Sequence, residues 1–321
     1  MTVVPLRLTM TCGPYDRARA LIEGSVSPRD IQLEISVNAD DASRQAGATR
    51  GDFDVAELYM GSYIADLPQR SLGLTALPVF VKRMFRHSYI YINRTSGVRT
   101  AADLNGKRVG IQNWFTTAAL WTRGILADQY GVDLASITWV ASRAELPEGW
   151  AAPSWLKLEA APKNSSAIES LARGDVDASI TTEVWAPGVH PGVDFLFPDY
   201  VEQERAFFRQ TRCFPIMHVL VVRTRVLERH PWVARSLFDA WEESKQHCYR
   251  WLEWQRVHMT SMWYRDLWER ERELAGPDIY PWGFAKTRHE VDRLLRYAHE
   301  QGLTPLKYEP EEIFWPSMLE T

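Results

Sequence analysis

Two segments of this chain repeat one pattern, and together they indicate its fold. The first is FRHSYIYINR, residues 85–94, and the second is FPIMHVLVVR, residues 214–223. In each, a histidine (His87 or His218) precedes an apolar run that is rich in β-branched or aromatic residues and ends in arginine. Such runs are typical of buried strands. The repeat predicts a chain that crosses to a second lobe on one strand and returns on another, with a ligand cleft between the lobes.

The rest of the sequence alternates between strand-like and helical stretches. Strands are expected at 6–10, 31–37, 53–58, 107–111, 137–140, 178–181 and 194–197, and helices at 15–23, 41–48, 116–130 and 167–173. Strand–helix–strand repetition implies parallel βαβ units. After the second histidine the chain turns helical, from Pro231 to about Leu274 and again over 286–300.

We therefore expect an α/β protein with two lobes, each a mixed sheet flanked by helices. Residues 1–90 and 222–321 would form lobe one, which includes the C-terminal helices, and residues 91–221 would form lobe two. A chain of 321 residues is long enough for two cores.

The composition is that of an ordinary globular protein, with 45% apolar and 24% charged residues. A net charge of −4 gives no reason to expect a nucleic acid or an anionic membrane as a partner. The chain has 14 tryptophans. We expect the helical series Trp241, Trp251, Trp254, Trp263 and Trp268 to form core and interface, and this segment is a candidate homodimer contact.

Three cysteines, Cys12, Cys213 and Cys248, have no metal-type spacing, and their odd number favours a reduced, cytoplasmic setting. The first residues lack the apolar stretch of a secretory signal. No run approaches the roughly 18 apolar residues that a membrane span needs.

Two junctions resemble the second lobe of type II periplasmic-binding-protein folds. They are DLNGKRVG at 103–110 and LARGDVDA at 171–178. Many transporters and enzymes share that fold, so this resemblance implies a fold and not a function.

Other motifs resemble the 4,5-dihydroxyphthalate decarboxylase family nearly from end to end. They are PVF (78–80), RMFRHS (83–88), TAALWTRG (117–124), LFPDY (196–200), FPIMH (214–218), ERHPW (228–232) and YAHEQGL (297–303). The resemblance implies a carboxy-lyase that acts on a hydroxylated, catechol-type aromatic acid without a cofactor.

Three loops depart from the family pattern: QNWFT at 112–116, residues 142–155, and TEVWAP at 182–187. All three should face the cleft, because ligands of open parallel sheets lie at the carboxyl ends of the strands. The resemblance therefore implies the reaction type more firmly than the identity of the acid.

Such a reaction needs a side chain that transfers protons. It also needs cationic side chains that bind the carboxylates. We assign proton transfer and the contact with the phenolic oxygen to His87 and His218, since histidine titrates near neutral pH. Arg83 and Arg86 are candidate carboxylate clamps. Thr116 and Thr117, at a helix N-terminus, are a second candidate anion site. Further substrate contacts are assigned to Tyr59, Ser62, Glu183 and Trp185.

Each assignment has a structural alternative. His87 or His218 would then be a packing residue, one of the two arginines a surface or hinge ion-pair partner, Thr116 and Thr117 an N-cap, and Tyr59 and Ser62 part of a turn. No metal is expected. His87, His218 and an acid such as Glu57 or Glu183 could meet in space, but no metal-type spacing supports this.

Two other functions stay open from the sequence. One is a solute-binding protein for an anionic aromatic ligand, which does no chemistry. The other is an enzyme of the same fold that acts on a different aromatic or heteroaromatic acid, which the three departing loops favour.

Overall fold

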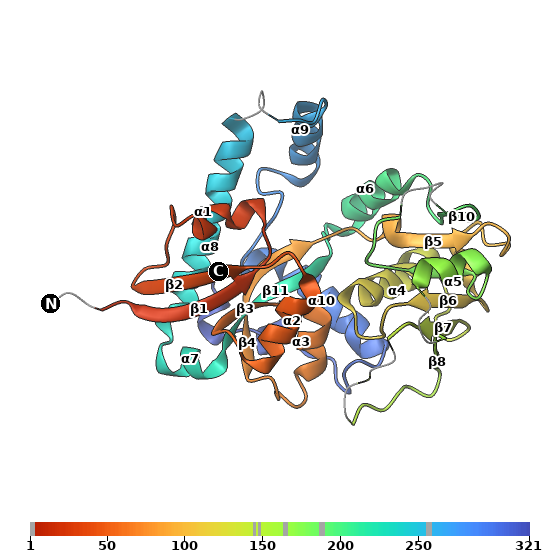
Figure 1. The fold of residues 1–321 in the computed structure, drawn as a ribbon, viewed down its shortest axis with the longest axis horizontal. Helices are drawn as coiled ribbons and strands as arrows, with labels where there is room; N and C mark the ends of the chain where they lie inside the picture. The colour runs from red at the N-terminus through yellow and green to blue at the C-terminus, as the bar shows by residue number, and fades with distance from the viewer. Residues whose placement is uncertain (1–3, 144–145, 147–148, 163–165, 186–189, 255–258) are drawn as a thin grey trace.

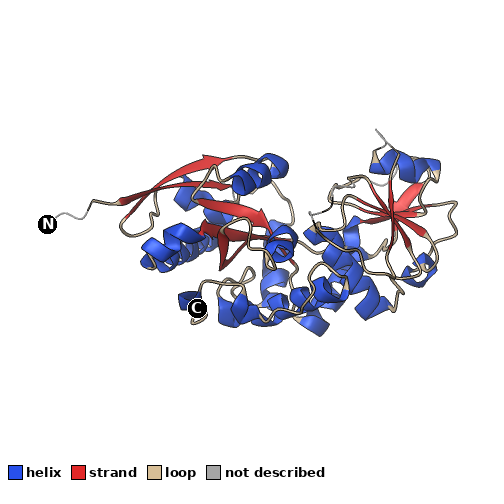
Figure 2. Cartoon of the chain, turned by 90° about the horizontal axis from the view of Figure 1, so that it is seen from below, coloured by secondary structure: helices blue, strands red, loops and turns tan. Residues whose placement is uncertain are grey.

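The structure, a computed structural model, describes residues 4–143, 146, 149–162, 166–185, 190–254 and 259–321. Its strands form two sheets at opposite ends of an elongated molecule, with helices beside and between them (Figures 1 and 2). The expected two-lobe α/β fold is confirmed.

Lobe one is built on a five-stranded sheet in the order β2-β1-β3-β11-β4. Its strands are β1 (Leu6–Cys12), β2 (Ile31–Val37), β3 (Val55–Tyr59), β4 (Leu74–Arg83) and β11 (Ile216–Arg223). β1 lies parallel to β2 and β3, whereas β11 lies antiparallel between β3 and β4. β11 is buried at every position except its last. A strand covered on both faces needs apolar residues throughout, which explains the second histidine segment.

Lobe two is built on a six-stranded sheet in the order β10-β5-β9-β6-β7-β8. Its strands are β5 (Ile90–Asn93), β6 (Arg108–Ile111), β7 (Thr138–Ala141), β8 (Lys157–Ala160), β9 (Ala178–Ile180) and β10 (Val193–Phe195). β5 is antiparallel to both of its neighbours, and the other pairs are parallel.

The helices complete both lobes. They are α1 (Arg19–Ile22), α2 (Asp41–Arg50), α3 (Met60–Asp66), α4 (Thr117–Tyr130), α5 (Ala167–Arg173), α6 (Tyr200–Thr211), α7 (Thr224–Arg229), α8 (Trp232–Trp254), α9 (Tyr264–Ala275) and α10 (Phe284–Glu300). Left-handed glycines, Gly131 and Gly174, end α4 and α5. Among the described residues, no helix has both the length and the apolar composition that crossing a membrane requires.

Both histidine segments lie at crossings between the lobes. The chain leaves β4 through residues 84–89, which include a 3₁₀ turn at His87–Tyr89, and enters β5. It returns from α6 to β11 through residues 212–215. Because β11 pairs with β4 from Ile216 onward and with β3 from His218 onward, the return crossing precedes the boundary that we expected after residue 221.

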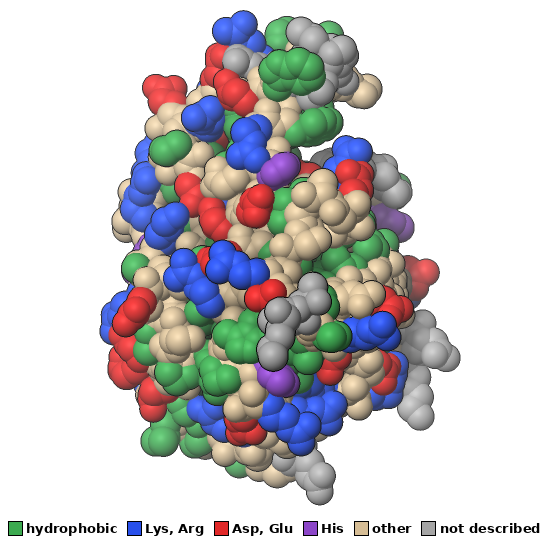
Figure 3. Space-filling view, turned by 90° about the vertical axis from the view of Figure 1, so that its left-hand side faces the viewer, with side chains coloured by type: hydrophobic (Ala, Val, Ile, Leu, Met, Phe, Trp, Pro, Cys, Tyr) green, Lys and Arg blue, Asp and Glu red, His purple; other side chains and the backbone are tan. Residues whose placement is uncertain are grey.

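The tryptophan-rich stretch forms two helices, α8 and α9, that pack together and project from lobe one (Figure 1). Trp241 and Trp268 are buried, as expected, but Trp251, Trp254 and Trp263 are 41%, 80% and 69% exposed and are not core. In the view of the lobe-one end, hydrophobic side chains are spread over the face among side chains of both charge signs (Figure 3). The homodimer contact stays a prediction.

Candidate active site

A cavity of about 260 Å³ brings residues of both lobes together. Asp41, Tyr59, Lys82 and His218 line it from lobe one, and Gln112, Thr116, Thr117, Arg143 and Thr182 line it from lobe two. Each of the three departing loops contributes to this wall through Gln112 and Thr116, Arg143, or Thr182, so the expectation that they face the cleft is confirmed for these residues. Residues 144–145, 147–148 and 186–187 of these loops lie outside the described residues. A larger groove, of about 560 Å³, runs along the outside of lobe one, but only lobe-one residues line it.

Three neighbouring strands place Tyr59, His218 and Lys82 in one row across the lobe-one sheet. His218 pairs with Tyr59 on β3 and with Lys82 on β4. Residues paired across antiparallel strands share a face, with their Cβ atoms about 5 Å apart. All three side chains line the cavity.

The pairing of β11 with β4 is irregular on both sides of His218. Pro78 lies in this irregular part of β4, which is an edge strand, where a missing backbone N–H is tolerated. Irregular pairing of this kind changes where a side chain points. It sets the register in which Lys82 lies opposite His218.

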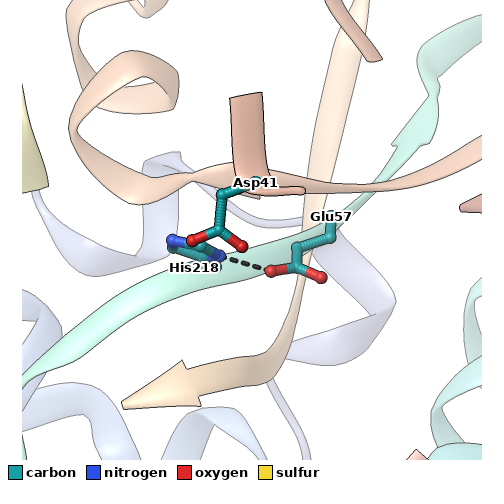
Figure 4. A group of neighbouring side chains, drawn as sticks. All are labelled: Asp41, Glu57 and His218. Carbon is teal, nitrogen blue, oxygen red and sulfur yellow. Dashed lines mark hydrogen bonds and ion pairs between the residues drawn. The ribbon is translucent and has the colours of Figure 1, made fainter. Parts of the chain in front are cut away.

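Glu57, on β3, holds the imidazole of His218. Its carboxylate is fully buried and accepts a hydrogen bond from Nδ1 of His218 (Figure 4). The backbone N–H of Gly13 and the hydroxyl of Tyr15 also donate to Glu57, at 2.9 and 2.6 Å, and the Arg44 guanidinium lies 3.3 Å away. Burial alone would raise the pKa of Glu57, but the hydrogen bond from His218, the charge of Arg44 and the hydrogen bond from Tyr15 outweigh it and lower the pKa below its usual range.

These contacts fix the chemical state of His218. Burial lowers the pKa of His218 below its usual 6.5, although its hydrogen bond to Glu57 opposes this. The neutral ring therefore keeps its proton on Nδ1, toward Glu57, and Nε2 points away from that carboxylate (Figure 4). The Tyr59 ring lies against the imidazole, with ring centroids 4.8 Å apart, and burial raises the Tyr59 pKa to about 12. His218 is thus a held, neutral base beside a phenol that stays protonated.

Asp41 is the third acidic group of this cluster. Its carboxylate binds Lys82, with Nζ–Oδ2 at 2.6 Å, and also contacts Arg44. Ligand atoms of Asp41, Glu57 and His218 lie within 4.8 Å of one another, as they would around a metal ion. However, the two cations already neutralise the two acids, so a metal would have to displace both from their partners. The absence of a metal stays a prediction, with a test given below.

Arg86 is a buried cation at the cavity wall. It is 2% exposed, and its guanidinium donates to the carbonyl of Thr181 at 2.6 Å and lies 3.3 Å from the Met84 sulfur. Its Nε has no partner, and no carboxylate in the described chain forms an ion pair with it. Burial lowers the Arg86 pKa to about 10, so the group remains charged at neutral pH. Within the described chain this buried charge is opposed by the more distant Glu204 carboxylate and by the Tyr89 ring, whose centroid lies 4.2 Å from the guanidinium carbon. A buried charge without a direct ion pair is costly, and an anionic ligand would supply that pair.

Lobe two adds further anion-binding groups to the cavity. The N-terminus of α4, with Thr116 and Thr117, faces it, and Arg143 lines it while forming no ion pair within the part of the chain described here. The Thr117 hydroxyl accepts a hydrogen bond from the backbone N–H of Gly61 at 2.9 Å, which joins α4 to the start of α3. A Cβ on Gly61 would lie 2.3 Å from the Phe115 carbonyl oxygen, so this approach of the lobes requires glycine.

Several residues that we expected at the site lie elsewhere. Arg83 forms a buried ion pair with Glu290 at 2.7 Å, which is the structural alternative for one of the two arginines. Trp185 packs on Tyr91 and donates to Glu183 at 3.0 Å, outside the cavity lining. Ser62 is not in the lining either. Arg83 and Trp185 are engaged by partners far along the chain, Glu290 and Tyr91, which strand periodicity does not reveal. Their roles in binding stay predictions.

His87 also lies outside the cavity lining. It is 1% exposed, and neither ring nitrogen has a hydrogen-bond partner in the described chain. The rings of Tyr130, Phe197 and Phe207 surround it at centroid distances of 5.4 to 6.0 Å. Burial lowers the His87 pKa to about 4, with Asp199 opposing weakly. The structure therefore does not bring the two histidines together, and a neutral packing role accounts for every contact of His87.

A His87→Phe variant should lose less stability in mild acid than the parent protein does. The unfolded chain binds a proton at His87 near pH 6.5, whereas the folded protein does so only near pH 4, so stability falls as the pH falls between these values. This linkage destabilises the parent by about 2 kcal/mol between pH 7.5 and pH 5. Urea unfolding at both pH values measures it, with His289→Phe as the exposed control. Equal pH dependence in the parent and His87→Phe would contradict the packing role.

Sequence reasoning did not find Lys82, Asp41, Gln112 or Arg143, and it considered Glu57 only as a metal ligand. One signal was available for Glu57: a lone acid in the apolar strand Val55–Tyr59, on the same face as Tyr59. Lys82 had no such signal, because its position depends on the irregular pairing of β4.

Solved structures with low sequence identity support the fold alone. The periplasmic aliphatic sulphonate binding protein SsuA of Escherichia coli has a TM-score of 0.56 at 14% identity, covering 99% of this chain and 100% of its own. The alkanesulfonate-binding protein SsuA of Xanthomonas axonopodis pv. citri has a TM-score of 0.50 at 14% identity, covering 97% and 98%. No model of a protein family matches the sequence.

Curated relatives are more similar in sequence. The 4,5-dihydroxyphthalate decarboxylase of Comamonas testosteroni is 32% identical over 326 residues, which cover 98% of each chain. The enzyme of the same name from Pseudomonas putida is 32% identical over 204 residues, covering 60% of this chain and 78% of its own. The chain therefore belongs to the 4,5-dihydroxyphthalate decarboxylase family.

Proposed function

We propose that this chain is a carboxy-lyase that removes CO2 from 4,5-dihydroxyphthalate without an organic cofactor or a metal. The observation that carries the proposal is that one cavity holds both a neutral histidine fixed by a buried carboxylate and a buried guanidinium that forms no ion pair within the described chain. The first group can move a proton, and the second can bind a carboxylate.

The chemistry follows from the substrate. In 4,5-dihydroxyphthalate each carboxylate has a hydroxyl group para to it. Nε2 of His218 takes the proton of that hydroxyl, and the oxygen then donates electron density across the ring. The ring carbon that bears the carboxylate accepts a proton, and loss of CO2 restores aromaticity. The phenolic oxygen recovers its proton from His218, and the product is 3,4-dihydroxybenzoate.

Substrate binding would use the cations around the base. Arg86 binds the carboxylate that leaves or the one that stays, through the parallel N–H groups that suit a planar anion. Arg143 and the N-terminus of α4 bind the opposite side of the ring from lobe two. Gln112, Arg143 and Thr182 come from loops that depart from the family pattern, so a related hydroxylated aromatic acid is the second candidate substrate.

A solute-binding role without chemistry would need only the anion-binding groups. It gives no reason to bury a Glu57–His218 pair, whose cost is met by four hydrogen-bonding partners of Glu57. The relatives named as decarboxylases also favour an enzyme.

The test is to incubate the purified protein with a panel of hydroxylated phthalates and benzoates and to measure CO2 and ring products by mass spectrometry. We expect one equivalent each of CO2 and 3,4-dihydroxybenzoate from 4,5-dihydroxyphthalate. A parallel series with a chelator should show unchanged rates. Tight binding without turnover of any acid would contradict the proposal that the protein is an enzyme. Turnover that a chelator abolishes and added metal restores would contradict the proposal that the reaction needs no metal.

A further inference from the structure

The proposed reaction needs a proton donor aimed at the ring carbon, and His218 does not supply it. Nδ1 of His218 is bound to Glu57, and Nε2 is the only ring nitrogen left for the substrate. In the proposed reaction this nitrogen takes the phenolic proton and returns it at the end. A second group must therefore protonate the carbon that loses CO2, on the opposite side of the ring from the hydroxyl.

We propose that Lys82 is this catalytic acid. The inference rests on the proposed function, and it names a residue that neither the motifs nor the resemblance singled out. Lys82 is the direct cross-strand neighbour of His218 on β4 and lines the same cavity. Cross-strand neighbours in a regular antiparallel pair have Cβ atoms about 5 Å apart, which is on the scale of one aromatic ring. Two adjacent side chains of the row therefore reach the two ends of one substrate.

The surroundings of Lys82 suit a proton donor. Its terminal nitrogen is held by Asp41 at 2.6 Å, so it is oriented. Its side chain is 26% exposed, in contrast to the 6% of His218, so water can return the proton after each turnover. Other basic groups at the cavity are unsuitable, because the guanidinium groups of Arg86 and Arg143 do not release protons at neutral pH.

The proton and electron balance of the step is complete. The ammonium of Lys82 transfers one proton to the ring carbon, whose new C–H bond uses the electron pair supplied by the para oxygen. The C–C bond to the carboxylate then breaks, its pair returns to the ring, and CO2 leaves. Lys82 regains a proton from water, so the net reaction consumes one proton for each CO2 released.

The competing explanation is that Lys82 contributes only charge, by pairing with Asp41 and attracting the anionic substrate. Lys82→Arg separates the two roles, since arginine keeps the charge and lacks a transferable proton. We expect Lys82→Arg to lower kcat for 4,5-dihydroxyphthalate by ~10²–10⁴-fold. Its Kd for phthalate, which lacks the hydroxyl groups and cannot react, should stay within a few-fold of the parent. Lys286→Arg, at an exposed ion pair with Asp278, is the matched control and should match the parent in both.

Chemical rescue gives a readout that a structural role would not move. In Lys82→Ala, added primary alkylammonium ions should restore turnover, with rates that depend on the acidity of the amine, and guanidinium should restore none. Rescue that guanidinium matches, or Lys82→Arg turnover near the parental rate, would overturn the proposal. Turnover by the parent protein is measured first. If the parent itself releases no CO2, the proposed function fails, and the assignment of Lys82 fails with it for that separate reason.

Discussion

His218→Ala is expected to lower kcat for CO2 release from 4,5-dihydroxyphthalate by ~10²–10⁴-fold, the usual loss for a placed proton-transfer group. The variant removes the proposed base for the phenolic proton, and no other described group at the cavity pairs a neutral ring nitrogen with a buried carboxylate. The Kd for phthalate should change little, because phthalate has no hydroxyl group for Nε2 to contact. Stopped-flow or mass-spectrometric CO2 assays measure kcat, and calorimetric titration measures Kd.

Two further variants locate the cause of that loss. Glu57→Gln should also reduce kcat, because an amide group facing Nδ1 can favour the tautomer that carries its proton on Nε2. His289→Ala, at an exposed histidine, should leave kcat unchanged. Parental turnover by both His218→Ala and Glu57→Gln would rule out the pair as the catalytic base.

Arg86→Met should weaken phthalate binding by ~30- to 3,000-fold, which corresponds to about 2–5 kcal/mol for removing one partner of a buried charge pair. The same variant should fold with equal or greater stability without ligand. Arg86 forms no ion pair in the described chain, and Glu204 compensates its charge only at longer range, so methionine removes a costly buried charge. Loss of affinity with no loss of stability is the signature of a group held for a ligand.

Arg83→Met is the matched control three residues away, and its expected effects are the reverse. It leaves the Glu290 carboxylate buried without its ion-pair partner, so the free energy of unfolding should fall by about 3–5 kcal/mol. Phthalate affinity of the folded fraction should stay within a few-fold of the parent. Urea unfolding and calorimetry on both variants give the comparison. If Arg83→Met lost affinity and Arg86→Met lost stability, the roles assigned to the two arginines would be exchanged.

Local sequence patterns predicted much of the fold. The strand at 31–37 and the helix at 167–173 have the predicted bounds, because period-2 alternation and a terminal glycine are signals within a few residues of one another. The two crossings also followed from a local pattern, the histidine before an apolar run. The prediction of one continuous helical stretch after Pro231 was wrong. The structure has two helices there, α8 and α9, and the sequence has no plain signal for the break between them.

The site was harder to predict because it depends on pairs that are far apart in the chain. His218, Arg86, Tyr59, Thr116 and Thr117 were expected at the cavity and line it. Arg83, Arg86 and His87 lie in one short motif, and the local sequence does not show which of them reach the cavity. The ion pair with Glu290 occupies Arg83, and three aromatic rings enclose His87. Lys82 is opposite His218 only through the irregular register of β4 and β11.

The two walls of the cavity differ in how freely they can change during evolution. Lys82, His218 and Glu57 are fixed by strand pairing and by a charge-balanced cluster, in which loss of buried Glu57 or Arg44 would leave the other charge unmatched. Gln112, Arg143 and Thr182 lie on connections, which tolerate substitution. A descendant of this protein could therefore come to accept a different substrate acid through loop substitutions alone. It would keep the residues proposed for proton transfer unchanged. Selectivity and reactivity would then diverge at different rates within one lineage.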